Sequence, residues 1–267
     1  MTAKTFIFSL LFLLIGFVSC QDKNEKTKVL EKTAKEVVVN RTFPANIDRV
    51  FKAHGGYAHW AKQQYLTFTL PKPDGNEIHQ IDLRSRKDRI HTDKFSLGFD
   101  GKEVWIKQDS TYFKGNPKFY HNLMFYFYAM PFVLGDPGVI YEPAEDLVYQ
   151  DTLYKGLKIS FEAEVGDTPE DNYFLYYHPE TGRMAWLGYT VTFFSGEPSD
   201  KVSYIHYAGW QVFHGLLLPT RLEWHEYKDG KLGKMTNGVT FTDIQVSDTI
   251  PNRRIFEKPE GATTVVD

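Results

Sequence analysis

The sequence predicts a mainly β protein: a long antiparallel meander curved into a half-barrel, with an N-terminal helix and an aromatic inner helix on the concave face. Apolar and polar residues alternate along much of the chain beyond residue 65, which is typical of strands with one buried and one wet face. Turn-forming residues separate these alternating runs. One apolar run near the middle does not alternate, and we interpret it as the inner helix.

The first segment, residues 1–19, has the pattern of a signal peptide. Lys4 provides a positive charge, and the apolar run from Phe6 to Val18 has the length of a signal core. This run is shorter than the roughly 20 residues that a membrane-spanning helix needs. We therefore expect that the segment directs export and is then removed.

Cys20, the single cysteine among 267 residues, is the predicted lipidation site. Val18, Ser19 and Cys20 resemble the lipobox of bacterial lipoproteins, although Phe17 stands where that pattern usually has Leu. The resemblance implies cleavage before Cys20, diacylglycerol on its sulfur and an acyl chain on the new amino group. Acyl chains contribute about 0.8 kcal/mol per buried CH₂, so several of them would anchor a domain to a membrane. The alternative is an ordinary secretory signal followed by an incidental free cysteine.

The rest of the chain divides into a tether, one domain and a tail. Residues 20–43 are rich in Lys and Glu and predict a solvated spacer behind the lipid. Residues 44–260 predict a single β-rich half-barrel domain, because neither an internal repeat nor a second boundary interrupts them. Residues 261–267 predict a C-terminal tail. We expect the protein in the cell envelope, lipid-anchored at the outer membrane, with the periplasmic and surface faces both left open.

The N-terminal helix is predicted from Asn46 onward. Asn46 is a residue type that caps helices, and Ile47, Val50 and Phe51 follow with helical spacing. His54 lies where Gly55-Gly56 ends the helix, so we expect its ring to form a helix-end hydrogen bond rather than to act as a ligand.

The strands are predicted from period-two alternation and from the turns between them. The clearest alternating runs are 66–70, 81–83 and 157–163, and hairpin turns are expected at Asp100-Gly101, at Pro179–Gly182 and at Asp229-Gly230. Residues 79–91, HQIDLRSRKDRIH, predict a charged strand with Asp82, Arg84 and Arg86 on one face. Cross-strand ion pairs explain such a ladder, although the arginines could also hold an acidic head group.

The inner helix is predicted over Asn116 to Ala129. Residues 119–134 hold thirteen apolar or aromatic residues among sixteen, and Pro131 ends the helical pattern. A helix that is apolar on nearly all sides must be buried on nearly all sides. We therefore place it against the concave face of the sheet.

The aromatic residues suggest a binding cavity. The chain has 21 Phe, 16 Tyr and 5 Trp, and each buried Tyr hydroxyl needs a partner that a dry core rarely offers. We therefore expect a lipid or another apolar ligand in a cavity beneath the inner helix. The candidate lining residues are Trp105, Phe119, Tyr120, Phe125, Phe127, Trp186, Trp210 and Trp224. A filled aromatic core is the alternative.

Several strings together resemble an uncharacterised family of Bacteroidota envelope lipoproteins, over about residues 45–260. They are Asn116–Leu123, Met130-Pro131-Phe132, Val165-Gly166-Asp167 and Gly215–Thr220. The family has no assigned activity, so the resemblance implies none. The order helix, meander, inner helix and C-terminal strand is also similar to the half-barrel of the periplasmic lipoprotein carriers and their outer-membrane receptors. Those proteins hold acyl chains in a concave cavity, but no individual carrier residue maps onto this sequence.

Composition excludes several function classes. A net charge of −3 offers no basic surface for nucleic acid, and one cysteine allows neither an intrachain disulfide nor a multi-cysteine metal site. The chain lacks HExxH, GxSxG and a phosphate-binding glycine loop, so no cofactor or metal is expected.

Two alternatives to ligand binding stay open. One is a metal-assisted or acid–base hydrolase that uses His206, Glu223 and His225, and the other is a structural envelope component without a small ligand. The oligomeric state is not predicted.

Overall fold

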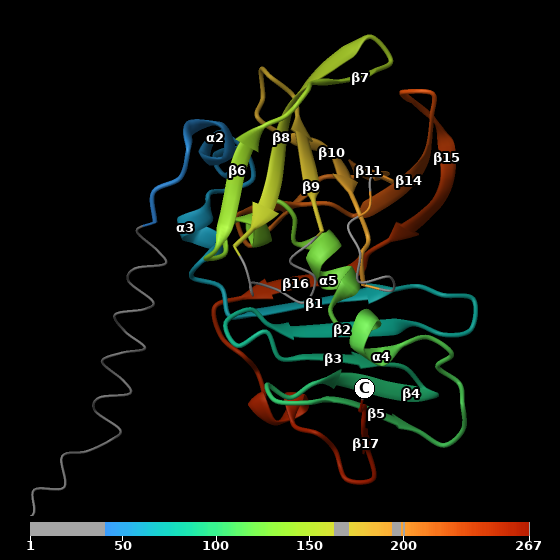
Figure 1. Cartoon of the computed structure of the whole chain (residues 1–267). Coiled ribbons are helices and arrows are strands. Elements are labelled where there is room, and N and C mark those ends of the chain that lie inside the picture. Colours follow the sequence, from blue (N-terminus) through green and yellow to red (C-terminus); the bar gives the residue numbers. More distant parts are fainter. Residues whose placement is uncertain (1–40, 163–170, 194–198, 200, 267) are drawn as a thin grey trace, which may run out of the picture. The chain divides into compact units, whose positions relative to one another are not determined.

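The computed structural model describes residues 41–162, 171–193, 199 and 201–266, which belong to the compact unit Val39–Asp267 (Figure 1). The signal peptide, Cys20, most of the tether and the string Val165-Gly166-Asp167 lie outside the described residues. The described part is mainly β, and its three antiparallel sheets have seven, eight and two strands. None of these sheets closes into a barrel, so the predicted fold class, an open half-barrel, is confirmed.

The seven-stranded sheet contains the first run of strands. Its order is β16-β1-β2-β3-β4-β5-β17. The strands are β1 (Tyr65–Leu70), β2 (Glu77–Asp82), β3 (Asp88–His91), β4 (Phe95–Phe99), β5 (Val104–Gln108), β16 (Thr242–Ser247) and β17 (Thr263–Thr264). The predicted turn at Asp100-Gly101 joins β4 to β5, and Gly101 has the positive φ of 96° that such a tight turn requires.

The eight-stranded sheet contains the second run. Its main path is β15-β14-β11-β10-β9-β8-β6, and β7 pairs with β8 beside that path. The strands are β6 (Val139–Pro143), β7 (Leu147–Tyr149), β8 (Thr152–Phe161), β9 (Tyr173–Tyr177), β10 (Met184–Tyr189), β11 (Ser203–Ala208), β14 (Arg221–Lys228) and β15 (Lys231–Thr240). The small hairpin of β12 (Gln211–Phe213) and β13 (Leu216–Leu218) separates β11 from β14. The turns predicted at 179–182 and at Asp229-Gly230 join β9 to β10 and β14 to β15.

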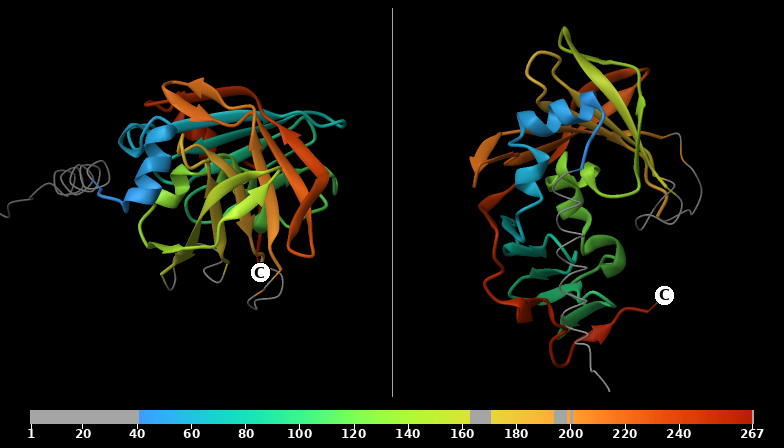
Figure 2. Two further views of the ribbon diagram at one scale, coloured as in Figure 1. Left: turned by 90° about the horizontal axis from the view of Figure 1, so that it is seen from above. Right: turned by 90° about the vertical axis from the view of Figure 1, so that its left-hand side faces the viewer.

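The chain passes from one large sheet to the other at Phe241. This residue alone separates β15, which pairs with β14, from β16, which pairs with β1. Asp243 has a positive φ of 50°, and the β1–β16 register shifts opposite it, between Thr67 and Thr69. Such bulges bend a strand. The two large sheets are therefore parts of one meander that bends between β15 and β16, and Figure 2 shows the two sheets from two further sides.

The N-terminal helical region consists of α2 (Ala45–Ala53) and α3 (Tyr57–Trp60). Ile47, Val50 and Phe51 are fully buried, as their spacing predicted. The predicted cap at Asn46 is wrong, because α2 already begins at Ala45 and Asn46 lies inside its first turn.

The inner helix is present but is not continuous. The structure divides it into α4 (Pro117–Tyr120), α5 (Leu123–Tyr128) and the 3₁₀ helix η1 (Phe132–Gly135). The side chain of Asn116 caps α4 through the backbone N–H of Lys118 at 2.8 Å. At the break, His121 Nδ1 lies 2.6 Å from Asp88 Oδ2 on β3, a contact that the apolar pattern could not predict.

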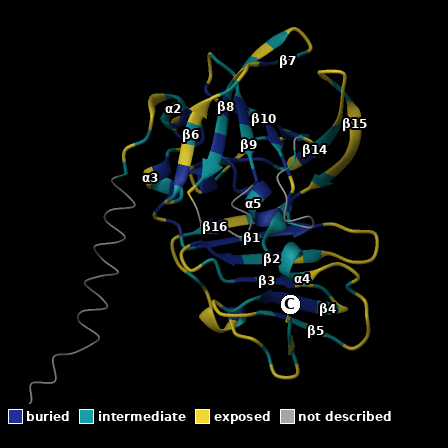
Figure 3. Cartoon of the chain, in the orientation of Figure 1, coloured by how far each residue is buried: buried dark blue, intermediate teal, exposed yellow. Residues whose placement is uncertain are grey.

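The inner helix α5 lies between the two large sheets, and α4 lies beside the seven-stranded sheet (Figures 1 and 3). The Tyr128 ring lies 4.7 Å from Phe68 on β1 and 4.6 Å from Phe241. The Phe132 ring stacks on Trp60 at 4.8 Å. Aromatic contacts therefore join the inner helices to the sheet and to the N-terminal helices.

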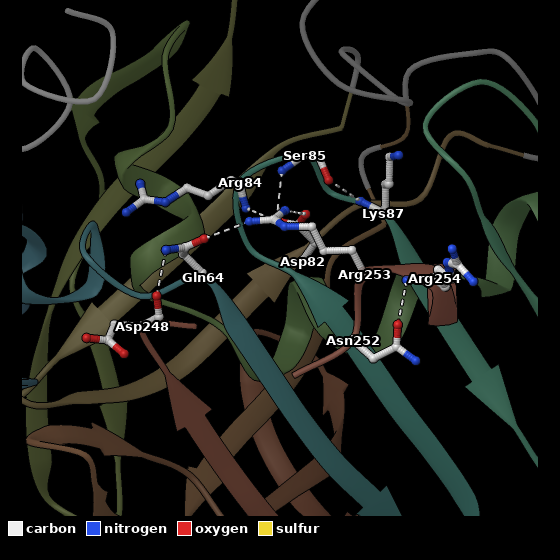
Figure 4. A network of polar contacts seen from close by, with 9 residues as sticks. All are labelled: Gln64, Asp82, Arg84, Ser85, Lys87, Asp248, Asn252, Arg253 and Arg254. Atoms are coloured by element: carbon white, nitrogen blue, oxygen red, sulfur yellow. Dashed lines mark hydrogen bonds and ion pairs between the residues drawn. The ribbon is translucent and has the colours of Figure 1, made fainter. Parts of the chain in front are cut away.

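A polar network fastens the segment after β16 to the end of the seven-stranded sheet (Figure 4). Arg253 donates to Gln64 Oε1 at 3.1 Å and lies 3.6 Å from Asp82, and Gln64 donates to the backbone oxygen of Asp248 at 2.6 Å. Asp82 also accepts the backbone N–H of Arg84 at 2.9 Å. Residues 79–91 are therefore not one strand. Their ends belong to β2 and β3, residues 83–87 form the turn between these strands, and the expected ladder of Asp82, Arg84 and Arg86 on one face is absent.

Residues on both sides of the predicted domain, 44–260, contact it. Arg41 donates to the backbone oxygen of Gly135 at 2.6 Å, and the Phe43 ring lies 4.8 Å from Phe51. These two residues of the predicted tether are therefore attached to the domain. Within the expected tail, β17 pairs with β5, and the backbone N–H of Val265 donates to Val104 at 2.9 Å. Among the helices that the structure describes, none is long and apolar enough to span a membrane.

Gly98 offers a test of the close approach between β3 and β4. A Cβ atom at Gly98 would lie 2.2 Å from the backbone oxygen of Asp88, whereas one at Gly238 on β15 would lie at an ordinary 3.4 Å from Leu222. We expect Gly98→Ala to lower the free energy of unfolding by about 1–3 kcal/mol because β3 must shift. Gly238→Ala should change it by no more than about 0.5 kcal/mol. Urea unfolding of both variants measures the difference, and equal effects would contradict the strand geometry.

Candidate ligand pocket

A pocket of about 460 Å³ lies between the inner helices and the eight-stranded sheet. From the helical side it is lined mainly by Phe119, Leu123, Phe127, Met130, Val133 and Leu134. From the sheet it is lined mainly by Val139, Phe161, Tyr173, Tyr189 and Trp224. Most of its wall is therefore apolar or aromatic.

Sequence spacing explains the helical wall. Phe119, Leu123 and Phe127 follow one another at intervals of four, so they line one side although α4 and α5 are separate helices. The Phe127 ring lies 4.9 Å from Tyr189 and 6.1 Å from Trp224. The helix and the sheet therefore meet at Phe127.

The sheet contributes residues that neighbouring strands bring together. Tyr173 on β9 pairs directly with Tyr189 on β10. Trp224 on β14 donates its indole N–H to the Tyr189 hydroxyl at 3.0 Å. This hydrogen bond satisfies the indole donor, so the Trp224 ring can present an apolar surface.

Polar groups at the pocket already have partners within the protein. Asp171 accepts the backbone N–H of Thr192 at 2.7 Å, and Asp136 forms an ion pair with Arg86. Burial raises the pKa of Asp136, while the charge of Arg86 opposes that shift. The backbone oxygen of Phe127 accepts the Tyr207 hydroxyl at 2.7 Å. The pocket therefore favours ligands with few polar groups.

A second pocket, of about 330 Å³, lies on the side of the inner helices that faces the seven-stranded sheet. It includes Arg86, Asp88 and His121, so it is more polar than the first. Four residues line both pockets: Lys118, Asn122, Tyr126 and Phe193. The two pockets therefore adjoin.

The structure places half of the predicted cavity residues at these pockets. Phe119, Phe127 and Trp224 line the first pocket and Phe125 lines the second. Tyr120 lines neither, because its hydroxyl turns to β2 and donates to Glu77 Oε2 at 2.6 Å. Ligand binding by these residues stays a prediction.

The other three tryptophans lie elsewhere. Trp105 is fully buried on β5, and Trp210 packs against His54 with 4.7 Å between ring centroids. Trp186 belongs to a separate buried cluster with Leu147, Tyr176 and Tyr204. Tyr189 is the third residue after Trp186 on the same strand, and side chains an odd number of residues apart point to opposite faces of a sheet. The expected common wall of four tryptophans therefore does not form.

Sequence reasoning missed Phe161, Tyr173 and Tyr189 on the sheet side of the pocket. All three were visible as aromatic residues on predicted strands. Alternation divides the residues of a strand into two faces, but it does not say which face the helix covers. The missing information was the pairing of each strand with its neighbours.

The residues of the hydrolase alternative converge, on the face opposite Trp224. His206 on β11 pairs with Glu223 on β14, and His225 follows two residues later on the same face. His206 Nδ1 lies 2.9 Å from Glu223 Oε2. Burial alone would raise the pKa of Glu223, but hydrogen bonds from His206 and Arg221 hold it below its usual value. The three side chains therefore form a cluster that is separate from the pocket.

Residues 78–204 match the model of a family of unknown function (DUF6503). This match confirms the resemblance to an uncharacterised family. No curated protein matches the chain.

Among solved structures, the chain is similar to a LolA superfamily protein from Nitrosomonas europaea, with 12% identity, a TM-score of 0.43, and 73% of this chain and 89% of that chain covered. A DUF1329 family protein from Desulfovibrio piger shows 9% identity and a TM-score of 0.42, with 85% and 96% covered. Because both TM-scores are below 0.5, these similarities carry no argument about function. We therefore infer the function from the pocket.

His54 makes stability depend on pH. Its Nδ1 donates to the backbone oxygen of Val50 at 2.7 Å, which confirms the expected helix-end bond. Burial, together with the charge of Arg183, lowers the pKa of His54 from 6.5 to about 4. The unfolded chain then binds the proton more tightly than the folded one, so stability falls as the pH drops from about 6.5 to about 4, by about 3 kcal/mol.

We expect that the free energy of unfolding of His54→Gln, which keeps a donor for Val50, changes much less between pH 7 and pH 4.5 than that of the wild type. Urea unfolding at a series of pH values measures this dependence. His178→Gln, which removes a partly buried ring outside this contact, should retain the wild-type pH dependence. An unchanged slope in His54→Gln would contradict the assignment.

Proposed function

We propose that this protein is a membrane-anchored lipoprotein of the cell envelope that holds a lipid or another apolar ligand in the pocket beneath α4 and α5. The observation that carries the proposal is the pocket of about 460 Å³ with its largely apolar wall. Small-molecule sites in proteins have volumes of about 300–1,000 Å³ and walls of this composition.

The chemistry of the wall favours an aliphatic chain as the ligand. Phe119, Leu123 and Phe127 offer aromatic and aliphatic carbon on one side, and Trp224 offers its ring on the other. Each CH₂ group that leaves water for such a surface contributes about 0.8 kcal/mol. The buried polar groups at the wall already have partners, so a ligand gains little from polar groups there.

The anchor forms the second part of the proposal. Lipidation at Cys20 would hold the domain at the membrane, and the charged segment that follows would act as a spacer. A domain fixed near a bilayer would meet its apolar ligand where that ligand is concentrated. The outer membrane is our proposed place of anchoring because the sequence resembles envelope lipoproteins, and the proposal includes no role for nucleic acid.

The pocket can be tested by filling it. Leu123 lines the pocket, whereas Leu153 on β8 is 44% exposed and lies outside it, so the two Leu→Trp variants form a matched pair. We expect Leu123→Trp to weaken binding of a fluorescent fatty acid by about tenfold or more, since the indole would occupy the space of the ligand. Leu153→Trp should bind like the wild type.

The measurement is a fluorescence titration of the full chain in detergent. Circular dichroism of both variants checks the fold, and native mass spectrometry of the wild type checks for lipid that co-purifies. Equal affinity in the two variants, or a wild type that neither binds the fatty acid nor carries lipid, would overturn the proposed pocket.

The anchor is tested separately. We expect Cys20→Ser to abolish the incorporation of labelled palmitate in cells and to move the protein from the membrane fraction to the soluble one, because the thioether and the acylated amino group can no longer form. Labelling and membrane fractionation measure both effects. Continued palmitate labelling of the variant would contradict lipidation at Cys20.

A further inference from the structure

The cluster of His206, Glu223 and His225 has no part in the proposed pocket. It lies on the other face of the eight-stranded sheet, where the fully buried Trp186 supports it. The Trp186 ring lies 4.6 Å from that of His206 and 4.9 Å from that of His225. These contacts fix the orientation of both imidazoles.

His225 has the hydrogen bonding of a metal ligand. Its Nδ1 lies 2.9 Å from the backbone oxygen of Gly233 on β15. A carbonyl oxygen can only accept, so Nδ1 must carry the proton, and in the neutral ring Nε2 then holds a free lone pair. This Nε2 is buried and has no hydrogen-bond partner among the described residues. A backbone carbonyl that fixes the tautomer in this way is the usual support of a histidine ligand.

His206 and Glu223 carry the other two candidate ligand atoms. His206 Nδ1 and Glu223 Oε2 are 2.9 Å apart, while the second oxygen of Glu223 accepts Arg221 Nε at 2.5 Å. Arg221 therefore engages only one carboxylate oxygen and leaves the other hydrogen-bonded to His206. An ion that takes Nδ1 of His206 as a ligand would displace the proton of this hydrogen bond. The side chain of His206 is 30% exposed, which gives an ion a path from solvent.

The spacing fits a small cation. One ligand atom from each residue can be chosen so that all three lie within 4.8 Å of one another. An ion with bonds of about 2.0–2.2 Å holds neighbouring ligand atoms roughly 3–3.6 Å apart. If these side chains moved roughly 1 Å closer together, their ligand atoms would therefore reach the spacing that such an ion requires.

Other buried histidines do not share this arrangement. The Nε2 atoms of His54 and His79 are also buried without a hydrogen bond. Among the described residues, however, only His206, Glu223 and His225 form a group of three ligand-bearing side chains within this distance. The convergence of the group, and not the unpartnered nitrogen alone, distinguishes the site.

We propose that His206, Glu223 and His225 bind a divalent transition-metal ion of the zinc class. Two imidazoles and one carboxylate suit Zn²⁺ and its neighbours, whereas Ca²⁺ and Mg²⁺ prefer oxygen ligands alone. Three protein ligands would leave one position of a tetrahedral ion open. The site is independent of the apolar pocket.

The test uses the full chain without a histidine tag, in detergent and after treatment with a chelator. Co²⁺ is titrated and its visible absorption is followed, and Zn²⁺ is then used to displace it. We expect one equivalent of Co²⁺, with the spectrum of a nitrogen-ligated ion of low coordination number. His225→Gln and Glu223→Gln should each weaken binding by about tenfold or more. His91→Gln, which removes an exposed imidazole from the other sheet, should have no effect.

A thermal melt gives a second readout, because an ion that binds only the folded chain raises the melting temperature. Zn²⁺ should stabilise the wild type and His91→Gln more than the two cluster variants, whose fold circular dichroism checks. Failure of the wild type to bind one equivalent would overturn the proposal, as would equal affinity in His225→Gln and His91→Gln. Neither result would bear on fatty-acid binding at Leu123.

Discussion

The contact of Tyr128 with Phe68 and Phe241 is the interaction on which the rest of the structure depends. The Tyr128 ring lies 4.7 Å from Phe68 and 4.6 Å from Phe241, and the latter two rings meet at 5.1 Å. The three residues come from α5, from the start of the meander and from the point where the meander changes sheets. Their burial fixes the inner helices in the bend, and the wall of the pocket follows from that position.

This arrangement gives the two faces of the eight-stranded sheet different roles. Trp224 and Tyr189 face the inner helices and line the pocket. His225 is the next residue after Trp224, and it points away with His206 and Glu223. One strand thus serves an apolar site on one face and a polar cluster on the other, because successive side chains of a strand alternate. A ligand and an ion would therefore not compete for the same groups.

The pocket exists because the helices do not fill the bend. A continuous helix over 116–129 would present one unbroken apolar surface to the sheet. Instead the chain breaks at His121, which turns to Asp88 on the seven-stranded sheet, and Lys118 and Asn122 line pockets on both sides. The polar contact between His121 and Asp88 accompanies the division of this space in two. Each pocket thereby has its own chemistry, apolar on one side and more polar on the other.

The sequence by itself determined the mainly β class, the three hairpin turns, the buried face of α2 and the aromatic segment under which the pocket lies. These features depend on neighbours a few residues apart, which periodicity and turn chemistry record directly. The sequence also indicated Phe119, Phe127 and Trp224 as residues that line a cavity. Only the tertiary structure decided that Trp186 faces away from them, that the inner helix breaks at His121, and that His206 meets Glu223 and His225. Each of these depends on contacts between residues distant in the chain, and a period of two or of 3.6 cannot say which face a distant segment will cover.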